Sequence, residues 1–494
     1  MHLLKDILYK SGAVELKGST NMAIASVTAD SRKVQKNGLF VAVKGTQSDG
    51  HQFIDKACEA GAVAVVCEQF PEKLTEGCTY VLVKDSAFAL GIIASNFFEN
   101  PSEKLRLVGV TGTNGKTTIA TLLFELFRSM NYSCGLISTV KNQIDNLTIT
   151  ASHTTPDAVQ LQQLLAQMVK AGCSYVFMEV SSHAAEQQRI AGVDFVLGIF
   201  TNITHDHLDY HGTFENYLLA KQKFFNQLSP LANVLVNRDD ANALKITENT
   251  KAKVHTYGLS PGADYHCKVV EKQLNGMLLR MEGADLGDGI DLWSSLIGNF
   301  NASNLVAVFG AASILSHDDS VHILTKISNL HSVEGRFQYL RSANGVTAII
   351  DYAHTPDALK NVLDTIRDIR TGNEQVITLI GCGGDRDNAK RPEMARIAVE
   401  LSDRVVLTSD NPRSEDPEAI IQQMKSGVGG QNFKKVLSIT DRREAIRTAF
   451  ALANKGDIIL IAGKGHEKYQ EIKGVKYPFD DLEEVRQTFN TASN

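Results

Sequence analysis

The segment GVTGTNGKTT, residues 109–118, has the composition of a loop that binds phosphate. Its glycines let backbone N–H groups approach an anion, and a helix that follows would add the positive end of its dipole. We expect Lys116 to reach the β- and γ-phosphates of a nucleotide and the Thr117 hydroxyl to bind Mg²⁺. The general P-loop pattern has a glycine six residues before the lysine, where this chain has Val110, so the loop is a variant. A glycine-rich turn with an exposed lysine is the alternative.

Two further segments carry groups that bind divalent cations. Glu179 ends the apolar run SYVFMEV, and a carboxylate at a strand end near a phosphate loop is placed to hold Mg²⁺. The segment TNITHDHLDYHG, residues 201–212, contains His205, His207 and His211. A spacing of two along an extended loop does not bring four ligands together, which argues against zinc. We therefore expect one histidine to complete a Mg²⁺ or Mn²⁺ shell, with a polar loop of hydrogen-bonded histidines as the alternative.

Charged side chains near the end of the chain suggest an amino-acid site. Arg386 lies in GGDRD, Arg413 in SDNPR and Glu467 in GKGHE. Guanidinium forks suit carboxylates, so this set indicates a ligand with both carboxylate and ammonium groups, although ordinary surface ion pairs would also explain it. Lys221 lies in the segment YLLAKQKFF, and this local sequence predicts a solvated lysine on the surface.

Apolar runs alternate with helical patterns along the chain, which is typical of parallel sheets covered by helices on both faces. The runs predict strands at 39–43, 62–67, 105–110, 175–180, 195–200, 234–236, 347–350, 376–380, 405–407, 436–439 and 458–461. Apolar residues at 119, 122, 123 and 126 predict a helix after the phosphate loop, and Asp441 is the expected N-cap of a later helix.

The last group of strands has a shared feature at its strand ends. Nearly every strand there runs into polar or glycine residues: DYAHTPD (351–357), GCGGDRD (381–387), SDNPR (409–413) and AGKGHE (462–467). Ligands of doubly wound sheets bind beyond the carboxyl ends of the strands. These loops therefore predict one lined pocket.

Length and composition limit the fold and the class of ligand. A chain of 494 residues predicts roughly three domains. We expect an α/β protein with domains at 1–100, 101–330 and 331–494, the central one a P-loop-type, mostly parallel sheet with helices on both faces and the last one Rossmann-like. The net charge is −6 and no block of Lys and Arg stands out, which argues against nucleic-acid binding.

Localisation follows from what the sequence lacks. No apolar run is long enough for a membrane span, and the first residues do not have the pattern of a secretory signal. The seven cysteines are scattered and have no CxxC spacing, which favours a reducing compartment. We expect a cytoplasmic monomer.

Taken together, these motifs resemble those of the Mur ligases, the ATP-dependent amino-acid ligases of peptidoglycan precursor synthesis. GTNGKTT resembles their phosphate loop and NITHDHLDYHG their metal and substrate segment, and similar nucleotide-side motifs are GNFNASN (298–304), EGRF (334–337) and DYAHTPD. Within the family, the chain resembles the MurE type, which adds the third residue of the stem peptide. The segments that carry this resemblance are TADSRKV (28–34), HTTP (153–156), EVSSHAAEQQR (179–189) and SDNPR. DNPR resembles the form that accepts meso-2,6-diaminopimelate.

The resemblance implies a role for each domain: UDP-substrate binding for 1–100, ATP binding for 101–330 and amino-acid binding for 331–494. UDP-N-acetylmuramoyl-L-alanyl-D-glutamate would be held by Ser31, Thr154, Thr155, Ser181, Gln187 and Arg189. ATP would be held by Gly112, Thr113, Asn114, Gly115, Lys116, Thr117, Thr118, Asn301, Arg336, Asp351 and His354. Diaminopimelate would be held by Arg386, Asp410, Asn411, Pro412, Arg413, Gly463 and Glu467.

The resemblance also implies the cation ligands and the chemistry. Mg²⁺ would be bound by Thr117, Glu179, His207 and Lys221, the last as a carbamate, with Lys116, His207 and Lys221 as the catalytic set. ATP would activate the D-glutamyl γ-carboxylate as an acyl phosphate, which the amine of diaminopimelate converts to an amide. His153 departs from the family, where an asparagine is common at this place.

Three other readings stay open. The L-lysine-adding form of the same ligase usually differs at the arginine of the DNPR motif. A folylpolyglutamate synthase or another Mur ligase would use the same phosphate loop but would leave SDNPR and GKGHE without a role. A P-loop switch, from a different class, would release ADP without any amino acid.

Overall fold

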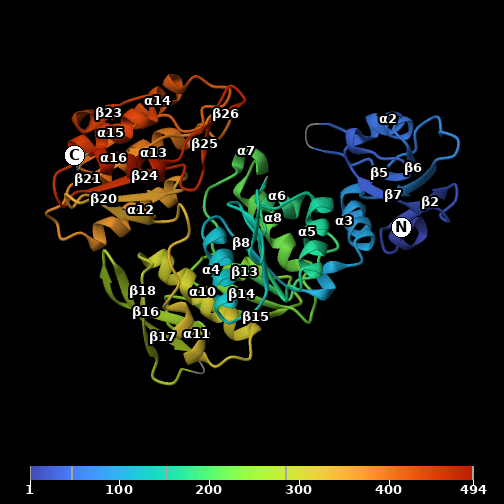
Figure 1. The fold of residues 1–494 in the computed structure, drawn as a ribbon, viewed down its shortest axis with the longest axis horizontal. Helices are drawn as coiled ribbons and strands as arrows, with labels where there is room; N and C mark the ends of the chain where they lie inside the picture. Colours follow the sequence, from blue (N-terminus) through green and yellow to red (C-terminus); the bar gives the residue numbers. More distant parts are fainter. Residues whose placement is uncertain (1, 46–47, 152, 284–285, 492–494) are drawn as a thin grey trace.

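The computed structural model describes residues 2–45, 48–151, 153–283 and 286–491, which fold around three main β-sheets (Figure 1). The N-terminal sheet projects to one side, and the central sheet lies between it and the C-terminal sheet. Among the described residues, none of the helices has both the length and the apolar character that crossing a bilayer would require.

The N-terminal sheet has the strand order β2-β7-β6-β5-β4, with β2 antiparallel at one edge and the other strands parallel. Its strands are β2 (Ala13–Lys17), β4 (Ser26–Thr28), β5 (Gly38–Val41), β6 (Ala62–Cys67) and β7 (Thr79–Val83), and β1 (His2–Leu3) pairs separately with β3 (Ala23–Ile24). Its helices are α1 (Leu4–Ile7), α2 (Ile54–Glu59) and α3 (Ser86–Phe97), with short 3₁₀ turns η1 (Ser31–Lys33) and η2 (Gly50–Phe53).

The central sheet has the order β11-β10-β9-β12-β8-β13-β14-β15-β16-β17-β18 in the described residues. Its middle strands are parallel, and antiparallel strands extend it at both ends. The strands are β8 (Arg106–Thr111), β9 (Cys134–Ile137), β10 (Asn142–Ile144), β11 (Leu147–Ile149), β12 (Tyr175–Glu179), β13 (Leu197–Phe200), β14 (Asn233–Asn237), β15 (Lys253–Gly258), β16 (Tyr265–Gln273), β17 (Gly276–Gly283) and β18 (Ile290–Ser294).

Helices cover both faces of the central sheet, because its apolar strands bury side chains on each side. Along β8, Leu107 belongs to one buried cluster and Val108 to the other, as the two-residue period of a strand requires. One face is covered by α4 (Lys116–Ser129), α10 (Asn299–Leu315) and α11 (Ser320–Ile327). The other is covered by α5 (Ala158–Lys170), α6 (Ser182–Glu186), α8 (Phe214–Asn226) and α9 (Ala243–Thr247). The 3₁₀ turn η3 (Pro101–Lys104) precedes β8, and α7 (Leu208–His211) precedes α8.

The C-terminal sheet has the order β19-β20-β24-β21-β22-β23, with only β19 antiparallel among the described strands. Its strands are β19 (Gln338–Arg341), β20 (Thr347–Asp351), β21 (Val376–Ile380), β22 (Arg404–Leu407), β23 (Val436–Ser438) and β24 (Ile458–Ala462), and a hairpin of β25 (Tyr469–Ile472) and β26 (Val475–Pro478) follows. Helices α12 (Pro356–Ile369), α13 (Lys390–Leu401) and α14 (Pro417–Lys425) cover one face and α15 (Arg442–Leu452) and α16 (Asp481–Thr491) the other, and the 3₁₀ turn η4 (Gly430–Lys435) leads into β23.

The structure confirms the predicted fold class and each strand predicted from an apolar run. Asp441 caps α15, because its carboxylate accepts the backbone N–H of Glu444. The antiparallel strands at the two ends of the central sheet were missed in the sequence analysis. The last strand of the N-terminal sheet ends at Val83 and the central sheet begins at Arg106, while the central sheet ends at Ser294 and the C-terminal sheet begins at Gln338.

Candidate active site

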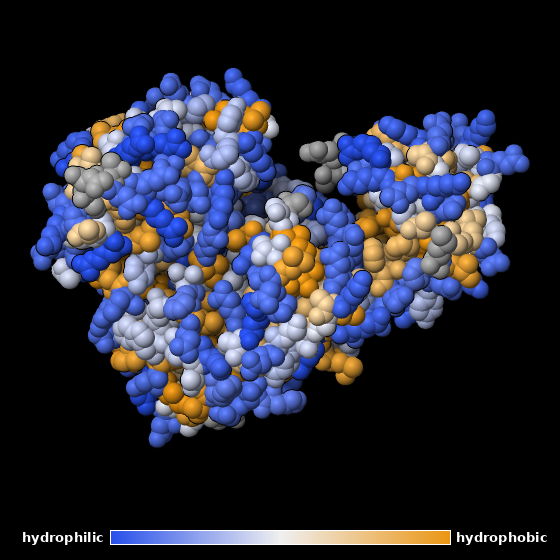
Figure 2. Space-filling view, in the orientation of Figure 1, coloured by the Kyte–Doolittle hydropathy of each residue, from blue (hydrophilic) through white to orange (hydrophobic). Residues whose placement is uncertain are grey.

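A cavity of about 840 Å³ lies where the carboxyl ends of the central and C-terminal sheets face each other. The central sheet contributes the phosphate loop together with Glu179, His207 and Lys221. All four strand-end loops of the C-terminal sheet line the same cavity, which confirms the prediction that they form one pocket. The molecular surface is notched between the C-terminal sheet and the projecting N-terminal sheet (Figure 2).

The phosphate loop joins β8 to α4 and is held by residues that follow β13. The Thr201 hydroxyl donates to the Asn114 carbonyl at 2.6 Å, and the Asn202 carbonyl and side-chain oxygens accept backbone N–H groups of the loop. Gly112 has φ +151°, and a Cβ there would lie 1.8 Å from the Thr201 hydroxyl, so only glycine fits. These contacts and the fit of Gly112 fix the shape of the loop.

Two lysines converge on one carbonyl oxygen of this loop. Lys116 Nζ donates to the Gly112 carbonyl at 2.9 Å, and Lys221 Nζ, from α8, donates to the same oxygen at 2.8 Å. Burial lowers the pKa of Lys221 well below its usual value, and the neighbouring Lys116 lowers it further. Burial lowers the pKa of Lys116 as well. Lys221 is only 1% exposed, so its reading as a solvated surface lysine is wrong.

Glu179 lies at the end of β12, beside the phosphate loop, and is fully buried. Its Oε1 accepts the backbone N–H of Thr139 at 2.7 Å, whereas its Oε2 is buried without a hydrogen-bond partner among the described residues. A buried carboxylate oxygen without a partner is costly unless a cation or donor reaches it. This orphaned oxygen fits a hard divalent cation.

His207 and Thr117 could complete such a site. Burial lowers the pKa of His207 to about 3, which leaves the neutral imidazole that a metal requires. The Thr117 hydroxyl accepts from Arg336 Nη2 at 3.2 Å. No group of three or more His, Cys, Asp or Glu side chains converges into a ready-made metal site in the part of the chain that the structure describes. A cation here would therefore need a ligand from its substrates or from a modified side chain.

A hydrogen-bond network connects most of the residues predicted to hold the UDP-substrate. Arg189 donates to the Thr155 carbonyl and, twice, to Gln187 Oε1. The Thr155 hydroxyl donates to the Glu179 carbonyl and accepts the backbone N–H of Ser181. Thr154, Thr155, Ser181 and Arg189 line the cavity, which places them next to the candidate cation site.

On the C-terminal side, the cavity is bordered by two arginines and a buried charge cluster. Arg413 has φ +51° and donates from Nη1 to the Gly384 carbonyl at 2.6 Å. Arg386 lines the cavity and has no ion pair among the described residues. The cavity therefore presents guanidinium groups to any ligand that carries a carboxylate.

Lys464, which the sequence analysis missed, is fully buried at the centre of the charge cluster. Its Nζ lies 3.2 Å from Glu467 Oε2 and 3.5 Å from Asp410 Oδ1, and it donates to Asn411 Oδ1. Burial raises the pKa of Glu467, and the nearby Asp410 raises it further. Asp410 Oδ1 is buried without a hydrogen bond in the described structure, and the Lys464 ammonium 3.5 Å away offsets its charge.

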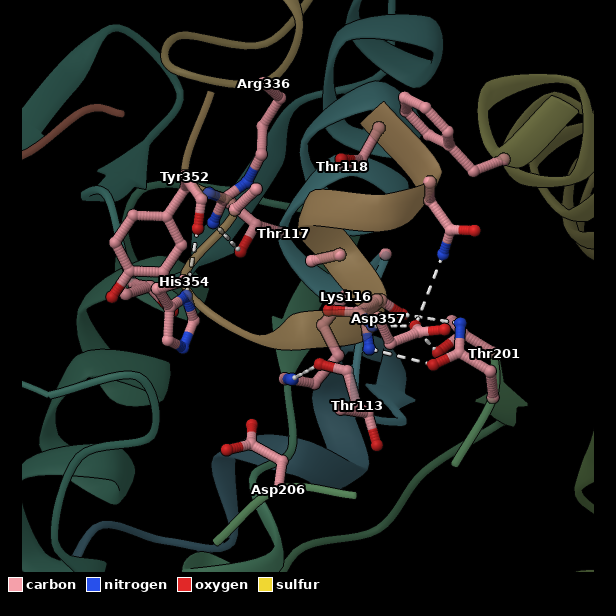
Figure 3. A pocket seen from close by; sticks show the side chains of 18 of the residues that line it. Thr113, Lys116, Thr117, Thr118, Thr201, Asp206, Arg336, Tyr352, His354 and Asp357 are labelled. Atoms are coloured by element: carbon pink, nitrogen blue, oxygen red, sulfur yellow. Dashed lines mark hydrogen bonds between the residues drawn. The ribbon is translucent and has the colours of Figure 1, made fainter. Parts of the chain in front are cut away.

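Direct contacts cross the cavity between the two sheets (Figure 3). Asn114 Nδ2 donates to Asp357 Oδ2 at 3.1 Å, and Arg336 reaches Thr117 while its guanidinium lies over the Tyr352 ring, 4.4 Å from the centroid. These contacts hold the phosphate loop against the C-terminal sheet.

Five residues predicted for the site do not line the cavity. Gly112 and Asn301 are buried behind it, Pro412 and Gln187 lie next to lining residues, and Ser31 lies in η1 beside the N-terminal sheet. The lining also includes residues that the sequence analysis did not assign, among them Tyr217, Asn304, Tyr352, Asp357 and Lys390. Asp357 lies in a motif that had been singled out, so its sequence context could have identified it.

Three family models match the chain: the Mur ligase family, catalytic domain (23–98), the Mur ligase middle domain (110–312), and the Mur ligase, glutamate ligase domain (335–465). A relative from Cytophaga hutchinsonii is 53% identical over 489 residues, 99% of each chain. One from Bacteroides thetaiotaomicron is 53% identical over 488 residues, 99% of this chain and 100% of the relative. Both bear the name UDP-N-acetylmuramoyl-L-alanyl-D-glutamate–2,6-diaminopimelate ligase. A solved structure with this name is 34% identical, covers 100% of this chain and 99% of its own, and has a TM-score of 0.72.

We predict that acid destabilises the protein partly through His354. Burial lowers the pKa of His354 to about 4, with Lys390 and Arg336 also lowering it and Asp206 opposing them. As the pH falls below about 6.5, His354 binds a proton in the unfolded chain, whereas in the folded chain it stays neutral until about pH 4. At pH 5 this effect costs about 2 kcal/mol. Urea unfolding at pH 8 and pH 5 should show His354→Gln losing less stability than the parent by about that amount.

His322→Gln is the matched control for this experiment, because His322 is an exposed residue of α11. This variant should lose as much stability as the parent on acidification. An equal loss of stability in His354→Gln and in the parent would show that the pKa of His354 in the folded protein is that of an ordinary histidine.

Proposed function

Because the chain belongs to the Mur ligase family, we propose that it joins 2,6-diaminopimelate, in its meso form, to the D-glutamyl γ-carboxylate of UDP-N-acetylmuramoyl-L-alanyl-D-glutamate. ATP drives the reaction and is converted to ADP and phosphate. The observation that carries this proposal is the single cavity, which is lined by the phosphate loop on one side and by Arg386 and Arg413 on the other. A ligase needs its nucleotide and its acceptor amine within reach of the same carboxylate.

The first step transfers the γ-phosphoryl group of ATP to the γ-carboxylate. A carboxylate oxygen attacks the γ-phosphorus, and the bond from this phosphorus to the oxygen that bridges it to the β-phosphate breaks. ADP departs, and the substrate now carries an acyl phosphate. The backbone N–H groups of residues 115–118, at the start of α4, and the Lys116 ammonium would offset charge on the transferring group. For this, Lys116 exchanges its two loop carbonyl partners for phosphate oxygens.

We assign the cation site to Glu179, His207, Thr117 and a carbamate on Lys221. When Mg²⁺ is bound there, it would neutralise part of the phosphate charge. The carbamate is supported by the two amines that share the Gly112 carbonyl. The low pKa of Lys221 supplies the neutral amine that CO₂ requires, and the carbamate would carry a negative charge that the Lys116 ammonium attracts.

In the second step, the neutral amine of diaminopimelate attacks the acyl carbon and phosphate leaves. Arg413 would pair with the distal carboxylate of the amino acid, which L-lysine lacks. Asp410 and Glu467 would receive its distal ammonium, and Lys464 holds both carboxylates in place. Lysine in this site would leave Arg413, whose Nε lies 3.7 Å from Glu471 Oε2, without the second carboxylate that diaminopimelate supplies.

The remaining assignments concern the residues that would hold the UDP-substrate, the nucleotide-side residues, the oligomeric state and the cellular compartment. Thr154, Thr155, Ser181 and Arg189 would hold the dipeptide end of the substrate, and Ser31 would contact its far end. Asn301, Asp351 and His354 would lie on the nucleotide side. Because one chain contains every ligand set, we expect an active monomer. Free thiols at all seven cysteines support a cytoplasmic setting.

The proposed function is tested by following ADP release in a coupled assay. We predict that ADP appears only when ATP, the UDP-muramoyl-dipeptide and diaminopimelate are all present. ADP release with L-lysine in place of diaminopimelate would indicate the lysine-adding form. Release with a folate substrate and glutamate would indicate a folylpolyglutamate synthase, and release without any amino acid a nucleotide switch.

We predict that Arg413→Ala lowers kcat/KM for diaminopimelate by roughly 100-fold, because a charge-assisted pair is lost. The affinity for ATP should stay unchanged, since Arg413 lies at the opposite side of the cavity. Steady-state kinetics and nucleotide titration measure the two quantities. Arg404→Ala, at the exposed start of β22, is the control and should behave like the parent. Parent-like kinetics in Arg413→Ala would remove Arg413 from the amino-acid site.

We predict that Lys221→Ala is nearly inactive and is partly rescued by short carboxylic acids, which can replace the carbamate. Lys223→Ala is the matched control, because Lys223 is on the same helix but pairs with Glu186 at the surface. ¹³C NMR of the parent protein in labelled bicarbonate should show one carbamate signal that the Lys221→Ala protein lacks. Full activity of Lys221→Ala without added acid would contradict the carbamate role.

A further inference from the structure

The N-terminal sheet carries a pair of cysteines that the ligase reaction does not use. Cys58, on α2, and Cys78, just before β7, place their sulfur atoms 3.7 Å apart. Of the seven cysteines, these two are partly exposed and the other five are buried. The two thiols that a solution reagent can reach are therefore the two that are in contact.

The surroundings of the pair distinguish the two sulfurs. The Tyr80 hydroxyl lies 3.6 Å from Cys58 Sγ and accepts the backbone N–H of Thr75 at 3.1 Å. Because its oxygen is occupied by that N–H, the hydroxyl hydrogen is free to be donated to Cys58 Sγ. Burial raises the pKa of Tyr80, so the hydroxyl remains a donor at neutral pH.

Hydrogen bonds to a sulfur stabilise its thiolate, which is the reactive form. The contacts with Cys78 and Tyr80 lower the pKa of Cys58 to about 6. The pKa of Cys78 is raised by the same contact. The Tyr80 hydroxyl, 3.6 Å from Cys58 Sγ, is the contact on which we assign Cys58 as the nucleophile of the pair and Cys78 as its protonated partner.

We propose that Cys58 and Cys78 form a dithiol that hydrogen peroxide oxidises reversibly to a disulfide. The Cys58 thiolate attacks one peroxide oxygen, the O–O bond breaks, and the leaving hydroxide takes up a proton to give water and a sulfenic acid. The Cys78 sulfur then attacks the Cys58 sulfur. The S–O bond breaks, and hydroxide leaves with the Cys78 proton as a second water. The dithiol loses two electrons and the peroxide gains them.

Closing this bond requires the sulfurs to approach from 3.7 Å to about 2 Å, which changes the packing of α2 against the start of β7. Both cysteines pack at the edge of a small apolar cluster that also contacts Val34. Val34 directly follows η1, which contains Ser31. We therefore expect oxidation to disturb binding of the UDP-substrate at Ser31 and to leave the chemistry in the distant cavity unchanged. This expectation rests on the proposed function.

The chemical step is tested by treating the full-length protein with hydrogen peroxide and mapping its peptides by mass spectrometry without reduction. A peptide pair linked through Cys58 and Cys78 that dithiothreitol separates is the expected result. In Cys78→Ser, dimedone should label Cys58 as a sulfenic acid, whereas in Cys58→Ser it should not label Cys78. Cys67 is the internal control, because burial raises its pKa to about 11 and it should stay unmodified.

Two outcomes would overturn the proposed dithiol. One is the absence of the Cys58–Cys78 link, and the other is modification of Cys67 as fast as Cys58. Tyr80→Phe, which removes the donated hydrogen bond, should slow the labelling of Cys58 relative to the parent, with circular dichroism to verify the fold. Equal labelling rates in a folded Tyr80→Phe protein would contradict the assignment of Cys58 as the nucleophile.

Kinetics of the oxidised and reduced protein test the link to the substrate. We predict a several-fold higher KM for the UDP-substrate in the cross-linked protein, with kcat unchanged and full recovery after reduction. An unchanged KM in a fully cross-linked sample would overturn this link. If the proposed function is wrong, the reduced protein shows no ligase turnover, while the mass-spectrometric result is unaffected.

Discussion

The carboxyl ends of two parallel sheets meet at one cavity, and the other features of the site depend on this constraint. Each sheet contributes a different part of the site. The central sheet contributes the phosphate loop, and the C-terminal sheet contributes guanidinium groups and buried carboxylates. The hydrogen bonds Asn114–Asp357 and Arg336–Thr117 join these parts across the cavity. A reactive acyl phosphate formed between them would be shielded from water by the same closure.

Some buried charged atoms at this cavity lack a hydrogen bond. Glu179 Oε2 and Asp410 Oδ1 are buried without hydrogen bonds among the described residues, and Lys221 donates to a neutral carbonyl. Buried groups without partners reduce stability, so a protein retains them where a ligand supplies the missing contact. At this cavity, Glu179 Oε2 lies at the proposed cation end and Asp410 Oδ1 at the proposed amino-acid end of the site.

The three sheets differ in the chemistry that they present. The N-terminal sheet takes little part in the cavity and carries instead the two partly exposed thiols, Cys58 and Cys78. Its separation from the cavity allows a change there to affect binding of a long substrate at one end without altering the reacting groups at the other. This arrangement suits a substrate with a nucleotide at one end and a reacting carboxylate at the other.

The sequence by itself determined the features that depend on neighbours in the chain. These are the strands, the phosphate loop with Gly112 and the strand-end loops, because local periodicity and backbone conformation encode them. Burial and pairing depend instead on residues far apart in sequence, and only the tertiary structure decided them. Lys221 has the local pattern of a surface lysine, yet packing places it on the Gly112 carbonyl, 109 positions away. Likewise, Lys464 became the centre of a charge cluster, and Cys58 met Cys78, only because three-dimensional packing brought their partners together.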